Sequence, residues 1–297
     1  MKIDDVFILE ERGILYISGD DTDTFLQNLI SNDIKKVNDS NSCFASLLTP
    51  QGKYLFEFII TKHKKGYFLE CEKKIIDALF VKLNSYKLRS KIELLNLSNE
   101  FVVAVLSREK FLTLDKSKDI AGFTTKFRED PIYLDPRNKN LGARLITNLE
   151  KLHLSLKLLK LKSTNVEQYY SISSEIGIPQ ISTDKLQNNL FGIECNLNEL
   201  NGIDFKKGCY VGQENTARIK LKDKLSKRLF PVEVIEGDLS KDNIIHHENT
   251  ELGKVLINNK FPFAIVKYKD KNFEFEKIFK CGSASVKIKK PYWFKFD

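Results

Sequence analysis

The sequence predicts an α+β fold that ends in a small all-β part. Up to about residue 225, apolar segments of strand length alternate with apolar segments of helical spacing, and no tandem repeat is visible. After Arg228 only short strand-like segments follow, which is typical of a small β-barrel or sandwich. We therefore expect two domains, residues 1–225 (with two subdomains) and residues 226–297.

The first elements follow from the apolar spacing near the amino terminus. Residues Leu9–Ser18 predict a β-hairpin that turns at Arg12-Gly13, because ILYIS has the pattern of a strand. A helix should follow, capped by the side chain of Asp20 or Thr22. The apolar face of this helix would consist of Phe25, Leu26, Leu29 and Ile30.

The segment TPQG at residues 49–52 is a turn signature between two apolar segments, so residues 43–61 predict a β-hairpin. The later elements up to residue 160 are expected to be a strand at Tyr67–Cys71, a helix from Ile75 to Leu83, strands at Ile92–Leu95, Val102–Leu106 and Ala143–Ile146, and an amphipathic helix from Leu149 to Leu159. The carboxy-terminal strands are expected at Phe230–Ile235, Gly253–Ile257, Phe263–Tyr268 and Ala284–Ile288. The aromatic cluster Tyr292–Phe294 should fill the core of that part.

Composition indicates a soluble protein. Of the 297 residues, 42% are hydrophobic and 30% are charged, which is ordinary for a globular chain. No apolar stretch approaches the roughly 20 residues that a membrane span needs, and acidic residues precede the short apolar segment at the amino terminus. We therefore expect a cytoplasmic protein that does not associate with membranes.

The cysteines and histidines do not form a metal-binding or disulfide pattern. There are five cysteines, widely spaced and without a C-x-x-C pair, and the four histidines are scattered. Neither a disulfide framework nor a zinc site is indicated, and we expect no stably bound metal.

The formal net charge is +8, and much of it falls in the segment Lys206–Arg228. Such a basic segment suits an anionic ligand tail, an acidic protein or nucleic acid, although a composition rich in lysine would explain it equally well. The basic residues are not interleaved with aromatic ones as in a surface that binds single-stranded nucleic acid. We do not expect direct nucleic-acid binding.

The segment KGCYVGQE at Lys207–Glu214 is the strongest chemical signal in the chain. It places Cys209 in a loop with a glycine on either side of the triplet CYV, and glycine allows conformations that other residues adopt only with strain. Lys206 and Lys207 favour the thiolate form of the cysteine electrostatically. The alternative is a turn whose cysteine only fills a gap. We take Cys209 as the candidate catalytic or working thiol.

With this motif the chain resembles the YgfZ family of folate-binding proteins, whose mitochondrial relatives serve iron–sulfur cluster assembly, and more distantly the aminomethyltransferase GcvT. The resemblance covers most of residues 8–220. It rests on LYISGDDTDTFLQNLISNDI (15–34), LLTPQGKYLFEF (47–58), YLDPRNKNLGAR (133–144), EIGIP (175–179) and NLNELNGIDFKKGCYVGQENTAR (196–218).

The resemblance implies a GcvT-like folate-binding fold: α+β subdomains around a central channel, followed by a small β-barrel. It also implies tetrahydrofolate as cofactor, which needs a flat apolar slot, a carboxylate for the pterin and cations for the glutamate tail. Glu175 lines up with the glutamate that binds the pterin in GcvT-type proteins. Lys207 and Arg218 are candidates for the tail, and Tyr210 and Gln213 of the motif are further candidates for cofactor binding.

The chain departs from the relatives at two positions. It has Ser173 where an arginine is often found and Gly192 where a proline is often found. No aspartate matches the catalytic one of GcvT, although Asp20 and Asp33 lie in the corresponding region.

The function that the resemblance implies is that of a tetrahydrofolate-binding accessory protein for iron–sulfur cluster assembly or repair, with an indirect effect on tRNA modification. Such a protein is more an assembly factor than an enzyme, and its partners would be assembly or client proteins bound transiently. A cluster usually takes about four thiolates, so a single working cysteine would share it with a partner. The alternative is a folate-dependent one-carbon transferase similar to the aminomethyltransferase.

Overall fold

The computed structural model describes residues 1–221, 225–239 and 243–296. The chain divides into two compact units. The first unit comprises Met1–Leu48, Phe56–Tyr169 and Leu200–Val211, and the second comprises Thr49–Leu55, Tyr170–Glu199 and Gly212–Asp297.

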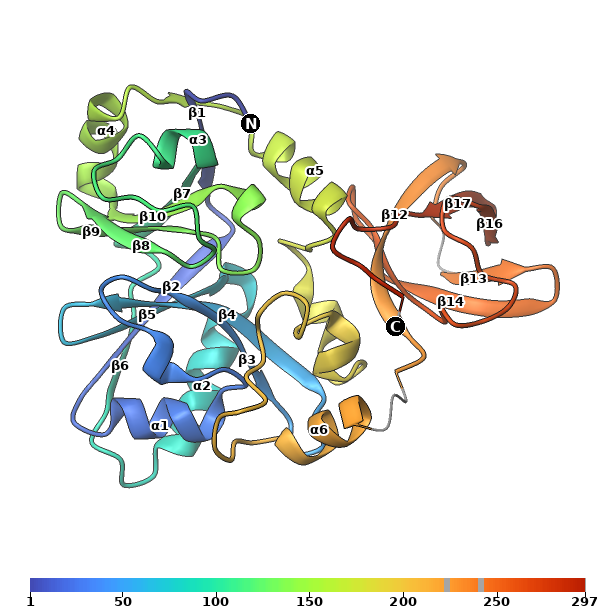
Figure 1. Cartoon of the computed structure of the whole chain (residues 1–297), viewed down its shortest axis with the longest axis horizontal. Helices are drawn as coiled ribbons and strands as arrows, with labels where there is room; N and C mark the ends of the chain where they lie inside the picture. The colour runs from blue at the N-terminus through green and yellow to red at the C-terminus, as the bar shows by residue number, and fades with distance from the viewer. Residues whose placement is uncertain (222–224, 240–242, 297) are drawn as a thin grey trace. The chain divides into compact units, whose positions relative to one another are not determined.

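One sheet of the first unit has the strand order β3-β4-β5-β2-β6 (Figure 1). Its strands are β2 (Arg12–Ser18), β3 (Cys43–Leu48), β4 (Tyr54–His63), β5 (Gly66–Glu72) and β6 (Glu93–Asn96). Helix α2 (Ile76–Lys87) packs against β2 and β6 through Ile76, Leu79 and Leu83. The neighbouring strands β3 and β4 confirm the predicted hairpin, and Gly52 in its turn has a φ of +78°, a conformation that favours glycine.

The second sheet of this unit has the order β11-β1-β7-β10-β9-β8. Its strands are β1 (Asp5–Leu9), β7 (Phe101–Leu106), β8 (Thr124–Phe127), β9 (Asp130–Leu134), β10 (Ala143–Asn148) and β11 (Lys162–Ser163). Helices α3 (Arg108–Phe111) and α4 (Leu149–Leu158) contribute Phe111, Leu152 and Leu156 to the core on this sheet.

The predicted hairpin at Leu9–Ser18 is wrong. Strand β1 pairs with β7 and β11, whereas β2 pairs with β5 and β6, so these consecutive strands belong to different sheets. Strand β2 is a central strand, which explains why Ile14, Leu15 and Ile17 are all buried.

Helix α1 (Thr22–Leu29) begins where the sequence predicted, but neither predicted residue caps it. Asp21 occupies the N-cap position and makes no side-chain cap hydrogen bond. Its carboxylate instead accepts a hydrogen bond of 2.7 Å from the backbone N–H of Lys91. The helix buries Phe25, Leu26 and Leu29 as expected.

The second unit contains a closed β-barrel formed by described residues, with the order β12-β15-β14-β13-β16-β17. Its strands are β12 (Arg228–Glu236), β13 (Ile244–His247), β14 (Thr250–Ile257), β15 (Phe263–Val266), β16 (Ile278–Cys281) and β17 (Ala284–Ile288). The predicted carboxy-terminal barrel is therefore confirmed. The predicted boundary between residues 225 and 226 stays a prediction, and residues 222–224 beside it lie outside the described residues.

Two residues of the carboxy-terminal aromatic cluster make stabilising contacts in this unit, one by packing and one by a hydrogen bond. Phe294 is buried in the barrel core, and the indole N–H of Trp293 donates a 2.6 Å hydrogen bond to the carbonyl of Ile176. Ile176 ends helix α5 (Val166–Ile176), and Gly177 follows it with a φ of +87°. Tyr292 is exposed, so only part of the predicted core cluster is buried.

The remaining helical elements are short. They are α6 (Gln213–Leu221) and the 3-10 segments η1 (Ile34–Lys36), η2 (Lys73–Ile75), η3 (Lys139–Leu141), η4 (Thr183–Leu186) and η5 (Gly192–Cys195). Within the described ranges no helix is long and apolar enough to span a lipid bilayer.

Candidate functional site

Cys209 lies exposed in the last segment of the first unit, Leu200–Val211. All five cysteines fall in the described residues and none forms a disulfide bond there; the other four are buried. Burial raises the pKa of both Cys43 and Cys71 to about 12, which keeps these thiols protonated. Cys209 is thus the thiol that a large partner can reach.

Hydrogen bonds hold the Cys209 loop, which we define as residues 202–211, against the end of α1. The backbone N–H of Asp204 donates to the carbonyl of Ser31 (3.0 Å), and that of Val211 donates to the carbonyl of Asn28 (3.2 Å). The hydroxyl of Ser31 donates to the carbonyl of Gly202 (2.6 Å). Hydrogen bonds therefore anchor the loop on both sides of its exposed cysteine.

Lys207 is the centre of this attachment. Its buried ammonium donates three hydrogen bonds to backbone carbonyls, those of Gln27 (2.7 Å), Ile30 (2.6 Å) and Asn32 (2.8 Å). Burial lowers the pKa of Lys207 to about 8, and the carboxylates of Asp33 and Asp204 oppose that lowering. Since all three N–H donors are engaged, the predicted role of Lys207 in binding a folate tail does not fit this geometry. Lys207 is a structural residue of the loop.

Tyr210 and the two glycines of the motif have different structural roles. Tyr210 is buried, and its ring centroid lies 4.9 Å from the ammonium of Lys207, so it packs under the loop. Gly212 has a φ of +85°, as the sequence argument requires. Gly208 has no positive φ, and a Cβ built there meets no atom within 4 Å. Glycine is therefore required at Gly212 and not at Gly208.

Gln213 and Arg218 belong to helix α6 in the second unit. Gln213 begins the helix and is half-buried, and Arg218 is exposed in its last turn. The side-chain amide of Asn215 on the same helix donates to the carbonyl of Gln51 (3.0 Å). The turn at residues 49–52 and the QENTAR part of the motif are thus neighbours in the folded chain.

Glu175 is exposed near the end of α5, also in the second unit. It lines an open cavity of about 780 Å³ together with Phe261 and the lysines Lys260, Lys289 and Lys290. Gln213 and Arg218 do not line this cavity. The six predicted site residues therefore fall into separate groups: Lys207, Cys209 and Tyr210 on one loop, Gln213 and Arg218 on α6, and Glu175 at the cavity.

The structure also explains the departure at Ser173. The residue is 1% exposed, and its hydroxyl donates to the carbonyl of Ile178 (2.6 Å) and accepts from the side-chain amide of Gln180 (2.8 Å). These contacts fix the turn after α5. The serine side chain at this position therefore has a structural role in the turn and points into the protein.

Sequence reasoning missed a buried ionic network in the first unit. The carboxylate of Glu70 on β5 accepts hydrogen bonds from Arg12 (2.8 Å), Arg144 (2.5 Å) and the hydroxyl of Tyr133 (2.8 Å). Burial alone would raise the pKa of Glu70, but the guanidinium groups of Arg144 and Arg12 outweigh it and hold the pKa below its usual value. The network joins the two sheets, since Arg144 lies on β10 and Tyr133 on β9.

Asp135 extends this network. Its carboxylate accepts from Arg137 (2.8 Å) and Arg144 (2.8 Å), and Arg144 also donates to the hydroxyl of Tyr169 (2.9 Å). Burial opposes ionisation of Asp135, yet the two guanidinium groups keep its pKa well below the usual range. A signal was present, because Asp135, Arg137 and Arg144 all lie in the segment YLDPRNKNLGAR on which the resemblance rests.

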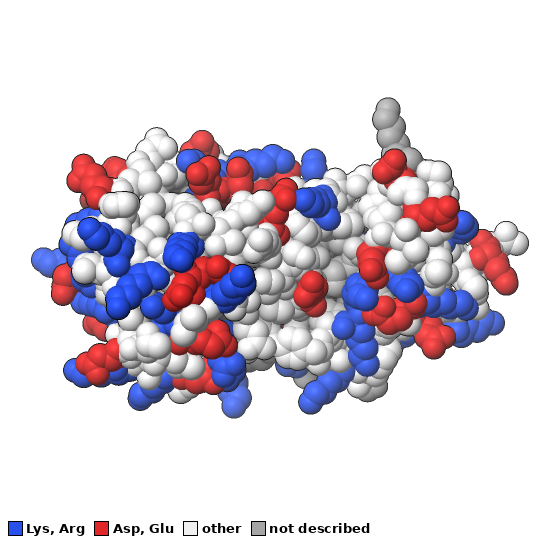
Figure 2. Space-filling model, turned by 90° about the horizontal axis from the view of Figure 1, so that it is seen from above, with Lys and Arg blue, Asp and Glu red and all other residues white. Residues whose placement is uncertain are grey.

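The surface charge is mixed. On the face shown in Figure 2, Lys and Arg side chains are interspersed with Asp and Glu, so that face has no extended patch of a single sign. Among the described residues, no group of three or more His, Cys, Asp or Glu side chains is arranged to hold a metal ion.

Comparison with known proteins finds no matching family model. Curated relatives include the iron–sulfur cluster assembly factor IBA57 homologue of Dictyostelium discoideum (27% identity, 80% of this chain, 64% of that protein) and that of Neurospora crassa (30%, 75% and 52%). The IBA57 protein of Mus musculus is 28% identical over 80% of this chain and 68% of its own length. The match with the first two thus spans between about half and two thirds of their length.

All three relatives are named as mitochondrial proteins. The expected cytoplasmic location is therefore wrong. It rested on the acidic residues ahead of the first apolar segment and on the lack of a stretch long enough to span a membrane, and neither feature identifies a cell compartment. The names of the relatives point to mitochondria instead.

Among solved structures, the glycine cleavage system aminomethyltransferase T from Bartonella henselae matches with a TM-score of 0.74. The match covers 97% of this chain and 86% of that chain at 12% identity, a level that shows the fold alone. The chain is therefore similar in sequence to proteins named as IBA57 iron–sulfur cluster assembly factors and has the fold of the aminomethyltransferase GcvT, in agreement with the resemblance seen in the sequence.

Proposed function

We propose that this chain is an accessory protein of iron–sulfur cluster assembly or repair, and that Cys209 is its working thiol. The observation that carries the proposal is the exposure of Cys209 on a loop that hydrogen bonds anchor on both sides, while the other cysteines are buried. The homology with assembly factors supports the same role.

The chemistry of a single exposed thiol limits what this role can be. A thiolate is a soft ligand suited to iron in clusters, but a stable cluster usually takes about four of them. Cys209 would therefore supply one ligand to a cluster whose other ligands come from an assembly or client protein. The cluster is cargo in this scheme, and binding of the partner is transient.

The proposed role is tested by rescue of cells that lack the chain. We expect Cys209→Ser to leave cluster-dependent enzymes inactive, because serine has the same shape but no thiolate. Gly208→Ala is the matched control, since it alters the adjacent residue without strain or contact. Normal enzyme activity with the serine variant would rule out the thiol as the working group.

We further propose that the chain binds tetrahydrofolate at the cavity lined by Glu175. The support is chemical: the cavity combines a carboxylate for the pterin, the ring of Phe261, and lysines for the glutamate tail. The candidates for the tail are Lys260, Lys289 and Lys290, and Lys289 also pairs with Glu276 (3.1 Å) and Glu233 (3.4 Å).

Calorimetric titration with tetrahydrofolate tests this second proposal. Glu175→Gln should weaken binding by on the order of tenfold, since it replaces charge-assisted hydrogen bonds by neutral ones. Glu167→Gln is the matched control, because Glu167 is an exposed glutamate on the same helix and does not line the cavity. Equal affinity of the two variants would exclude Glu175 from the folate site.

A one-carbon transferase remains the second candidate because the chain has an aminomethyltransferase fold. Such an enzyme needs a carboxylate near the folate nitrogen to move a proton. Asp33 is an N-cap whose carboxylate accepts from the backbone N–H of Lys35 (3.0 Å), and Asp20 is exposed. Formation of methylene-tetrahydrofolate from an aminomethyl donor would favour this candidate. An effect on tRNA modification would follow indirectly, through modifying enzymes that carry clusters.

A further inference from the structure

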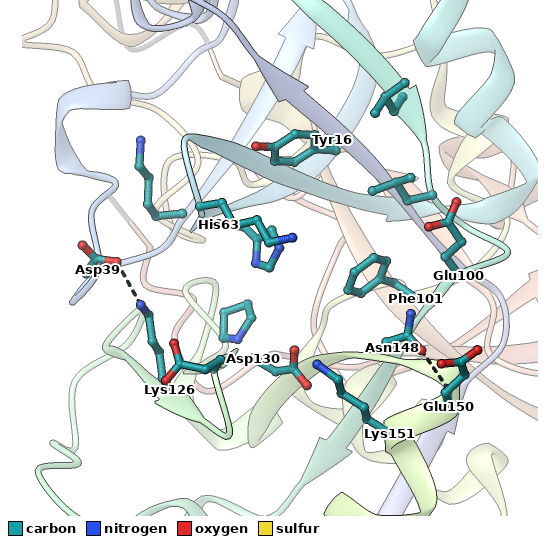
Figure 3. A pocket seen from close by; sticks show the side chains of 16 residues that line it. Tyr16, Asp39, His63, Glu100, Phe101, Lys126, Asp130, Asn148, Glu150 and Lys151 are labelled. Atoms are coloured by element: carbon teal, nitrogen blue, oxygen red, sulfur yellow. Dashed lines mark hydrogen bonds and ion pairs between the residues drawn. The ribbon is translucent and has the colours of Figure 1, made fainter.

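A second cavity, of about 720 Å³, lies within the first unit (Figure 3). None of its lining residues belongs to the Cys209 loop or to the cavity lined by Glu175. The residues come from both sheets: Tyr16 and His63 from one, Phe101 and Asp130 from the other, with Lys151 from helix α4. Its volume is in the range of cavities that bind small molecules.

Aromatic rings form one wall of this cavity. His63 stacks on Phe68 with ring centroids 4.1 Å apart and planes inclined by 17°. Tyr16 and Phe101 lie edge-on to His63, with centroids at 6.1 and 6.0 Å. Figure 3 shows Tyr16, His63 and Phe101 around the same hollow. A planar ring bound there would contact a preformed aromatic surface.

His63 is a neutral part of this surface at physiological pH. Burial, together with the nearby charges of Lys64, Lys126 and Lys151, lowers its pKa to about 4. The imidazole can therefore donate through one nitrogen and accept through the other. The three lysines that act on His63 come from three separate segments of the chain and converge on one cavity.

The rim carries charges of both signs. Its lysines are Lys62, Lys64, Lys126 and Lys151, and its acids are Asp39, Glu100, Glu129, Asp130 and Glu150. Two of the acids already have partners: Asp39 lies 3.9 Å from Lys126, and Asp130 accepts a 2.6 Å hydrogen bond from Thr147. The exposed carboxylates that remain can accept N–H donors, while the lysines can bind an anionic group.

We propose that this cavity binds a purine nucleotide. The base would lie on the surface formed by His63 and Phe101, and its N–H groups would reach rim carboxylates. Its phosphate would bind Lys151 and Lys126, and for Lys126 it would replace the 3.9 Å pair with Asp39. A purine nucleotide meets each part of the cavity: a flat ring for the aromatic wall, amino N–H donors (and, in guanine, a ring N–H) for the carboxylates, and a dianionic phosphate for the lysines.

Calorimetric titration of the full chain with GMP and with AMP at low salt tests this proposal. We expect Lys151→Gln to weaken binding severalfold, with the difference shrinking as salt increases. Lys157→Gln is the matched control, because Lys157 is exposed on the same helix and does not line the cavity. His63→Ala should weaken binding by on the order of tenfold through lost stacking.

Several results would overturn the proposal. One is the absence of binding by both nucleotides at millimolar concentration; another is inorganic phosphate binding as tightly as GMP, since the base would then not be read. If His63→Ala fails to fold, Phe101→Leu provides the stacking test, and unchanged affinity in the folded variant counts against the site. Glu175→Gln should leave nucleotide affinity unchanged, which keeps this test separate from that of the folate proposal.

Discussion

Replacing Lys207 with methionine should loosen the Cys209 loop. The change removes the three hydrogen bonds that the buried ammonium donates to the carbonyls of Gln27, Ile30 and Asn32. Methionine has a similar length and fills the space, but it offers no donor to these carbonyls. The perturbation is therefore confined to the attachment of the loop to α1.

The magnitude follows from the same contacts. Hydrogen bonds to charged groups contribute about 1.5–3 kcal/mol each. Burial of the ammonium, which lowers its pKa to about 8, opposes them. We expect Lys207→Met to reduce the free energy of unfolding by about 3 kcal/mol, which is less than the roughly 4.5 kcal/mol that three such hydrogen bonds would give at the low end of that range.

Two measurements check this expectation. Urea unfolding gives the change in stability, and hydrogen exchange gives its location, because the amides of Asp204 and Val211 should lose protection while those of the barrel do not. Lys206→Met is the matched control, since Lys206 is the exposed neighbour, and we expect it to change stability by less than about 0.5 kcal/mol. Equal losses in the two variants would refute the structural role of Lys207.

Three further predictions concern the ionic network and the glycines. Glu70→Gln should reduce the free energy of unfolding by about 3–5 kcal/mol in urea, because it leaves buried guanidinium groups without their counter-charge; a loss below about 1 kcal/mol would contradict this. The pKa values of Glu70 and Asp135 are lower in the folded chain than in the unfolded one, so the stability that they contribute is present above about pH 4 and is lost as the pH falls further. Unfolding followed by circular dichroism between pH 6 and pH 2 should therefore show a shallower decline in Asp135→Asn than in the wild type, and parallel curves would refute the assignment. Gly212→Ala should lower stability by about 1–2 kcal/mol because of its positive φ, whereas Gly208→Ala should be close to neutral in the same urea assay; similar effects would show that the loop has another backbone geometry.

The sequence predicted most elements of the fold, and the exceptions have physical causes. The apolar pattern of β2 identified a strand correctly, but a local pattern does not say which sheet a strand joins, and the supposed hairpin partner lies in the other sheet. Strands β13 and β16 were missed because each is four residues long and includes polar residues, whereas the equally short β15 is apolar throughout. The barrel could still be predicted from β12, β14, β15 and β17.

The candidate site was predicted only in part, because a local sequence pattern does not show which distant segments come into contact. The motif identified Cys209, because a thiol between glycines in a lysine-rich loop is unusual in sequence alone. Lys207 was predicted to bind the ligand because the sequence shows that it is a cation. The sequence does not show its hydrogen-bond partners, which are carbonyls of residues 27–32, far away in the chain. Glu70 and Arg144 were not recognised, because a charged residue in a strand is ordinarily read as facing solvent.

In the proposed function, Cys209 takes part directly in moving a cluster to a client protein. The most direct test is an anaerobic transfer assay, in which a cluster-loaded scaffold protein from the same cell activates an apo-enzyme in the presence of this chain. We predict that the wild type and Gly208→Ala increase the rate of activation and that Cys209→Ser does not. An equal rate with Cys209→Ser, in a chain that folds normally, would contradict the proposed function of the thiol.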